Sequence, residues 1–126
     1  MKEKENIQNN IIGIVGIGLM GSSIIVSLLV AGHKVKAIAP LPDDMENGPD
    51  RINEQLLQCE KGGLLQKSFS SYLEALSISE DYDELSDCSL VVECIIEDME
   101  AKELVFRKIL TVVDSTTILA SNTSAI

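Results

Sequence analysis

The chain has 126 residues, of which 45% are hydrophobic, and 20 acidic against 10 basic side chains give it a formal net charge of −10. This length suits one globular domain, and the apolar content argues against disorder. The acidic balance argues against nucleic acid as a partner, because phosphate backbones are bound by basic surfaces, and it disfavours anionic membrane surfaces for the same reason.

The first third of the chain predicts two strands and a helix after a polar tail. Residues 1–9 are mostly polar and are expected to form a frayed end. Residues 11–15 are a β-branched run typical of a buried strand, and residues 22–31 predict a helix that stops at Gly32. Residues 35–39 predict the second strand.

The middle of the chain is interrupted by prolines. Pro40, Pro42 and Pro49 predict a loop, after which helical spacing begins at Ile52 and ends at a pair of glycines, Gly62 and Gly63. A shorter helix is expected over residues 71–75, where Ser71 and Glu74 have the spacing of a capping box.

The last third completes an alternating pattern. A short strand is expected around Ile78, a fourth strand over residues 89–94, a helix over 99–113 and a fifth strand over 117–120. This order favours a doubly wound parallel sheet of the Rossmann type, with strand order 3-2-1-4-5 and helices on both faces.

The apolar stretch over residues 11–31 is long enough to cross a bilayer. The tail before it mixes Lys2 and Lys4 with Glu3 and Glu5, so a positive flank is missing. The glycines inside the stretch fit a motif of water-soluble domains instead, and we therefore expect no membrane span.

That motif is Gly-x-Gly-x-x-Gly, and it lies between the first strand and the first helix. There the first glycine permits a tight turn, the second lets the backbone approach a pyrophosphate, and the third allows close packing of helix on strand. The N–H groups at the helix start would face the phosphates. The predicted dinucleotide-binding residues of this segment are Gly16, Gly18, Leu19, Met20 and Gly21.

The second strand departs from the usual dinucleotide pattern. An acid normally follows that strand and binds the ribose 2′-hydroxyl, but here the position is Ala39, followed by Pro40. No arginine follows closely to bind a 2′-phosphate, so NAD is favoured over NADP as the cofactor. Asp43 or Asp44 either reaches back toward the ribose or only solvates the loop.

The three cysteines are Cys59, Cys88 and Cys94, and they form no Cys-x-x-Cys pair. With a single histidine in the chain, we expect no metal site. Reduced and mostly buried thiols in a cytoplasmic protein are the simplest interpretation.

The second half of the chain carries more specific motifs. Residues 91–98 read Val-Val-Glu-Cys-Ile-Ile-Glu-Asp, Lys102 follows, and residues 118–124 read Ile-Leu-Ala-Ser-Asn-Thr-Ser. Together with the glycine motif, these segments resemble the NAD-binding domain of the L-3-hydroxyacyl-CoA dehydrogenase family. The resemblance covers residues 10–126 and implies the same Rossmann-type fold.

The resemblance also implies roles for single residues. Glu97 and Lys102 match positions near the cofactor's ribose and nicotinamide half, Asn122 matches a residue at the nicotinamide end, and Ser124 matches the serine that binds the reacting substrate oxygen. Each has a simpler alternative: Glu97 as a helix-entry acid, Lys102 as a solvated helix residue, and Asn122 and Ser124 as turn formers.

The base of the family's reaction is a histidine after the Ser-Asn-Thr-Ser motif, followed by a helical substrate domain, and we expect this chain to stop before both. Its only histidine, His33, precedes the second strand, at the opposite end of the sheet. The resemblance implies hydride transfer between C3 of a 3-hydroxyacyl-CoA, such as 3-hydroxybutyryl-CoA, and NAD, in fatty acid metabolism. These residues alone are expected to be inactive.

The alternative is a non-catalytic nucleotide-binding module with a regulatory or assembly role. The expected partners are NAD(H) and, in the complete enzyme, an acyl-CoA substrate. The fifth strand, residues 117–120, would lie at a sheet edge without a blunting proline or lysine, and it is therefore a candidate surface for a homodimer.

Overall fold

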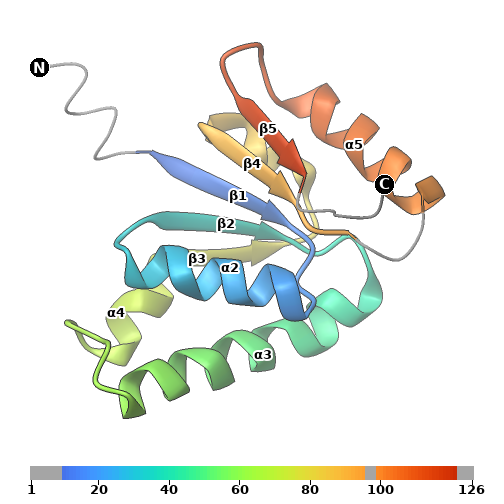
Figure 1. Ribbon diagram of the computed structural model, residues 1–126. Coiled ribbons are helices and arrows are strands. Elements are labelled where there is room, and N and C mark those ends of the chain that lie inside the picture. Colours follow the sequence, from blue (N-terminus) through green and yellow to red (C-terminus); the bar gives the residue numbers. More distant parts are fainter. Residues whose placement is uncertain (1–9, 96–98, 122–126) are drawn as a thin grey trace, which may run out of the picture.

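The computed structural model describes residues 10–95 and 99–121, which form one parallel sheet flanked by helices (Figure 1). The strands are β1 (Ile11–Val15), β2 (Lys34–Ile38), β3 (Leu76–Ser79), β4 (Leu90–Glu93) and β5 (Ile118–Ser121). The helices are α2 (Leu19–Val30), α3 (Pro42–Lys61), α4 (Phe69–Glu74) and α5 (Met99–Val112), with a 3-10 helix, η1 (Tyr82–Asp87).

The sheet has the order β3-β2-β1-β4-β5, and every neighbouring pair of strands is parallel. This confirms the predicted Rossmann-type sheet. The chain builds the sheet outward from β1 to β3 and then crosses to β4 on the other side. The connections after β1 and β4 therefore diverge at the carboxyl ends of these strands, toward opposite faces of the sheet.

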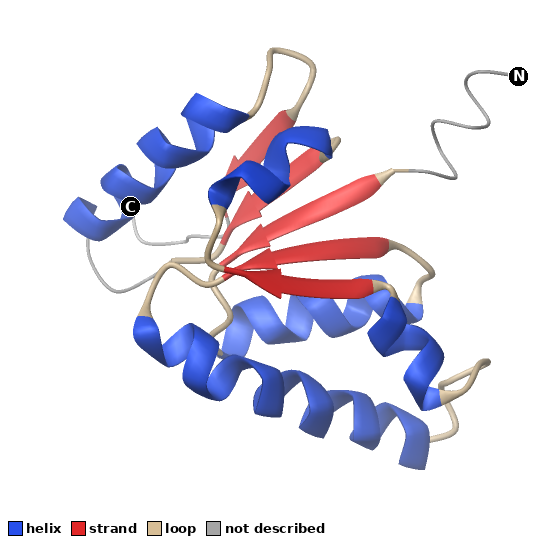
Figure 2. Ribbon diagram, turned by 180° about the vertical axis from the view of Figure 1, so that it is seen from behind, coloured by secondary structure: helices blue, strands red, loops and turns tan. Residues whose placement is uncertain are grey.

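Helices cover both faces of the sheet, as predicted (Figure 2). One core lies between the sheet and helices α2, α3 and α4, and the other lies between the sheet and α5 with η1. Because successive strand residues point to opposite faces, Ile14 belongs to the first core and Val15 to the second. The central strand β1 is buried on both sides, so its sequence is continuously apolar.

The start of α3 corrects the sequence analysis. Residues 40–49 were expected to form a loop, but the helix begins at Pro42 and continues through Pro49. Proline is favourable at the first helical position, because the N–H that it lacks would have no partner there. The Asp44 carboxylate accepts a hydrogen bond from Leu41 N at 3.1 Å and so caps the first turn. Pro49 lies inside the helix, where it cannot donate a backbone hydrogen bond.

Two smaller elements also differ from expectation. Helix α4 begins after Ser68, whose hydroxyl accepts a 3.4 Å hydrogen bond from Ser71 N, so the predicted cap at Ser71 lies three residues too late. The 3-10 helix η1 was not predicted, and Asp81 caps it by accepting from Asp83 N at 2.9 Å. Both starts depend on Ser and Asp side chains that bind nearby backbone N–H groups.

The apolar stretch over residues 11–31 is divided between β1, the glycine turn and α2. Among residues 10–95 and 99–121, no helix has both the length and the apolar character needed to cross a membrane. The hydrophobic side chains of this stretch supply much of the core beneath the sheet instead.

Candidate functional site

The carboxyl ends of the strands lie together at one end of the sheet, here called its carboxyl edge, toward which all arrowheads point in Figure 1. Gly16 follows β1, Ala39 follows β2, Cys94 follows β4, and Ser121 ends β5. Ligands of open parallel sheets bind at this edge, beside the point where the strand order reverses. The predicted site residues that the structure describes lie on elements that start or end here.

The glycine turn has the backbone geometry that the motif predicts. Gly16 has φ +107°, a conformation that side chains strongly disfavour, and its N–H donates to Ile38 O at 2.9 Å. A Cβ atom on Gly21 would lie 2.0 Å from Gly16 O. The two glycines therefore allow β1 to turn sharply and α2 to pack directly against the turn.

Gly18 has the opposite environment, because no described atom lies within 4 Å of the position that its Cβ would occupy. It is the N-cap residue of α2, and among the described residues no side chain caps this helix and no acid lies in its first turn. The N–H groups at a helix start lack partners within the helix and favour an anion. The space at Gly18 and the open helix start fit a pyrophosphate.

Leu19 and Met20 form the first turn of α2 and extend into solvent. Their exposed fractions, 77% and 53%, are large for apolar side chains. Five of the predicted cofactor-binding residues therefore lie together in the segment 16–21, as the motif requires.

A second cluster is centred on Glu93, the last residue of β4. Its side chain is 0% exposed, and Oε1 accepts from Lys102 Nζ and from Ser121 Oγ, both at 2.8 Å. Oε2 accepts from the N–H of Ile95. One carboxylate thus connects β4, the loop after it, α5 and the end of β5. Glu93 was not among the predicted site residues, although an acid that ends an apolar strand indicates a buried polar contact.

Lys102 lies on α5 and turns inward. It is only 8% exposed and forms an ion pair with Glu93, so the alternative of a solvated helix residue is wrong. The described part of the chain places Lys102 at the carboxyl edge of the sheet, close to β4 and β5. The other residues expected at this end of the site, Glu97, Asn122 and Ser124, lie outside the described residues.

His33 lies at the opposite end of the sheet, immediately before β2, as expected. Its N–H donates to Leu28 O at 3.0 Å, which closes the turn between α2 and β2. This position separates the imidazole from the glycine turn by the length of a strand. His33 is therefore a turn residue.

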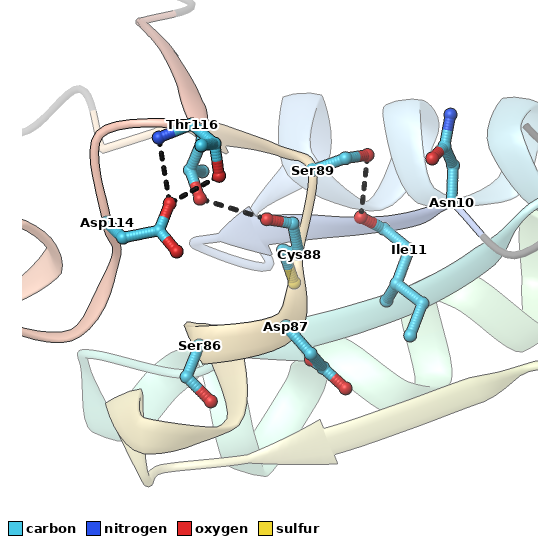
Figure 3. A pocket seen from close by; sticks show the side chains of 9 residues that line it. Asn10, Ile11, Ser86, Asp87, Cys88, Ser89, Asp114 and Thr116 are labelled. Carbon is cyan, nitrogen blue, oxygen red and sulfur yellow. Dashed lines mark hydrogen bonds between the residues drawn. The ribbon is translucent and has the colours of Figure 1, made fainter. Parts of the chain in front are cut away.

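A cavity of about 420 Å³ lies at the same distant end (Figure 3). It is bordered by residues near the starts of β1, β4 and β5. Two of its hydroxyls bind backbone carbonyls: Ser89 Oγ donates to Ile11 O at 3.4 Å and Thr117 Oγ1 to Cys88 O at 3.1 Å. These bonds connect the strand starts. The cavity is thus separate from the carboxyl edge.

Cys88 and Cys94 have no nucleophilic character in this setting. Cys88 and Cys94 are buried, and Cys59 is partly buried. Burial, followed by the nearby charges of Asp87 and Glu93 respectively, raises the pKa of Cys88 and of Cys94 to about 11. Both thiols are protonated at neutral pH. No group of side chains in the described residues has the composition of a metal site.

Comparison with known proteins agrees with this geometry. Residues 11–126 match the family model described as 3-hydroxyacyl-CoA dehydrogenase, NAD binding domain. The chain is 34% identical over 114 residues to a probable 3-hydroxybutyryl-CoA dehydrogenase of Bacillus subtilis, covering 90% of this chain and 40% of that protein. It is 32% identical to a peroxisomal fatty acid beta-oxidation multifunctional protein of Arabidopsis thaliana, covering 91% and 16%.

Solved structures show the same likeness. Mycobacterium tuberculosis FadB2 superposes with a TM-score of 0.83 at 34% identity, covering 91% of this chain and 41% of that one. The (S)-3-hydroxybutyryl-CoA dehydrogenase of Ralstonia eutropha also gives a TM-score of 0.83, at 29% identity, covering 93% and 42%. This chain therefore spans well under half of the length of these relatives.

Proposed function

The chain belongs to the 3-hydroxyacyl-CoA dehydrogenase family, whose NAD-binding domain it matches, and on this premise we propose that it binds NAD(H) at the carboxyl edge of its sheet for hydride exchange with a 3-hydroxyacyl-CoA. The observation that carries the proposal is the open space at Gly18, in front of the uncapped start of α2. NAD(H), when held by these residues, would supply hydride transfer at C3 of the hydroxyacyl thioester, and the hydroxyl proton would pass to a base.

The residues of the resemblance receive roles within this proposal. Gly16, Gly18 and Gly21, with the backbone N–H groups of Leu19 and Met20, would hold the pyrophosphate. Glu97 and Lys102 would lie near the ribose and nicotinamide half, Asn122 at the nicotinamide end, and Ser124 would orient the substrate oxygen. The names of the relatives support 3-hydroxybutyryl-CoA as a substrate. The names of these relatives do not support the alternative of a non-catalytic, regulatory nucleotide-binding module.

The described residues at the carboxyl ends of the strands include no histidine that could act as the base. A base must reach the proton that it removes. His33, the only histidine of the sequence, lies at the opposite edge of the sheet. We therefore expect the 126 residues to bind cofactor without turning over substrate.

The proposal also includes the cellular location and the self-association of the protein. We propose a cytoplasmic location, supported by three free thiols, of which two are buried, in a chain with bacterial relatives. We further propose self-association through β5. Among residues 10–95 and 99–121 this strand pairs only with β4, and Ile118 in it is 66% exposed.

Titration calorimetry with NADH tests the cofactor site. Wild-type protein is expected to bind NADH, and Gly18→Val is expected to abolish binding, because a branched side chain would fill the space in front of α2. Ser27→Val is the matched control, since Ser27 is an exposed residue of the same helix. Unchanged NADH affinity in folded Gly18→Val protein would place the cofactor elsewhere.

A further inference from the structure

Side chains of helix α3 bind the backbone of the glycine turn at Ile17. Ile17, between Gly16 and Gly18, donates its N–H to Asp44 Oδ1 at 2.8 Å, and its carbonyl accepts from Arg51 Nη1 at 2.9 Å. Both backbone polar groups of this residue are therefore bound by side chains that follow it by 27 and 34 positions.

This arrangement lies where the adenosine ribose binds in dinucleotide-binding folds, between the first glycine turn and the end of the second strand. Asp44 spans that interval, because its Oδ2 accepts from Leu41 N, just beyond β2. Ala39, at the usual place of the ribose-binding acid, is 4% exposed and has no polar side-chain atom. The charges beside the expected ribose site therefore come from α3.

The two neighbouring acids have different environments. Asp44 is buried, and its two oxygens accept backbone N–H groups, so it positions the turn. The Asp43 side chain is 57% exposed and forms a 2.8 Å ion pair with Arg51, whose side chain is 25% exposed. A hydrogen bond from Asn47 and the pairing with Arg51 hold the pKa of the Asp43 carboxyl below its usual value. Asp43 is therefore an anion at neutral pH, and it is accessible.

We propose that the Asp43–Arg51 pair determines the choice of coenzyme at this site, and this inference rests on the cofactor function proposed above. Without Asp43, the Arg51 guanidinium would be available to bind a 2′-phosphate. Asp43 neutralises it, holds it on Ile17 and repels a phosphate. NAD(H), which has a neutral 2′-hydroxyl, is accepted, and NADP(H) is disfavoured.

An arginine does lie beside the glycine turn, although none was expected directly after the second strand to bind a 2′-phosphate. Arg51 lies far beyond β2 in the sequence, and the prolines before it indicated a loop. Because α3 begins at Pro42, residues 44, 48 and 51 fall on one face of the helix, and that face packs against the glycine turn.

The test is calorimetric titration of NADH and NADPH into the same chain at fixed ionic strength. Asp43→Asn keeps the shape of the side chain and removes its charge, so NADPH affinity is expected to rise at least about fivefold relative to NADH, the factor equivalent to about 1 kcal/mol. Arg51→Gln added to Asp43→Asn is expected to remove this gain. Glu46→Gln, which removes the same charge from an exposed position of α3, is the matched control and should leave the ratio unchanged.

The outcomes separate the two proposals. A wild-type chain that binds neither coenzyme overturns the cofactor function and, with it, this inference. If NADH binds but the NADPH-to-NADH affinity ratio is the same in Asp43→Asn and wild type, or if Glu46→Gln changes it equally, only the role of the Asp43–Arg51 pair is overturned.

Discussion

The Glu93 carboxylate is removed from solvent, and Lys102 is the counter-charge that makes its burial tolerable. Such a pair contributes little net stability, because the loss of hydration offsets the attraction. The pair instead positions the ends of neighbouring elements, since the same carboxylate also accepts hydrogen bonds from Ser121 Oγ and Ile95 N. Breaking one half of the pair, however, leaves a buried charge without a partner.

Lys102→Met is therefore expected to reduce the free energy of unfolding by about 3–5 kcal/mol, as measured by urea denaturation. Adding Glu93→Gln removes the stranded charge, so the double variant should recover most of that loss. Arg107→Met is the control, because its ion pair with Glu103 is exposed. A double variant that is less stable than Lys102→Met would show that the Glu93 carboxylate stabilises the fold through Ser121 and Ile95 even without Lys102.

At the level of elements, helix α3 is one whose start was not predicted from sequence patterns. Strands, α2 and α5 follow from apolar periodicity, because each is decided by burial of its own residues. The start of α3 is decided by contacts distant in sequence: Asp44 and Arg51 bind Ile17, and Ile17 packs where Gly48 has no side chain. Pro42 at the first helical position and Asp44 as a cap are local signals, but the proline pattern contains no information on the contacts with Ile17.

Gly48→Ala tests this contact. A Cβ at position 48 would lie 2.6 Å from Ile17 Cγ2, so the glycine turn or α3 has to move. We expect a loss of about 1–3 kcal/mol in unfolding free energy, together with weaker NADH binding. Gly62→Ala, at the end of the same helix, is the matched control, because its nearest contact would be an ordinary 3.4 Å.

Urea denaturation and NADH titration of the two variants give a direct comparison. Equal stability and equal NADH affinity of Gly48→Ala and Gly62→Ala would mean that α3 does not position the glycine turn.

At the scale of the whole molecule, sheet order and layers were predictable because a right-handed parallel crossover leaves few topologies. The glycine segment of the site was predictable because its motif depends on backbone geometry. The Glu93 network and the Asp43–Arg51 pair were not, because they join residues from different elements whose contacts exist only in the folded sheet.

The sheet also has an open side at β5, and this side predicts self-association. Within the described residues β5 pairs only with β4, and Ile118 exposes an apolar side chain beside its unpaired backbone groups. The net charge of −10 opposes association at low ionic strength, but salt screens this repulsion. We therefore expect light scattering to show dimers at high protein concentration in moderate salt.

Ile118→Lys should shift this equilibrium toward monomer, because a lysine on an edge strand disfavours pairing with a second sheet. Leu57→Lys, at an exposed apolar position of α3, adds the same charge elsewhere and should leave the dimer intact. If wild-type protein stays monomeric across the concentration series in moderate salt, or if both lysine variants weaken the dimer equally, β5 is not the contact surface.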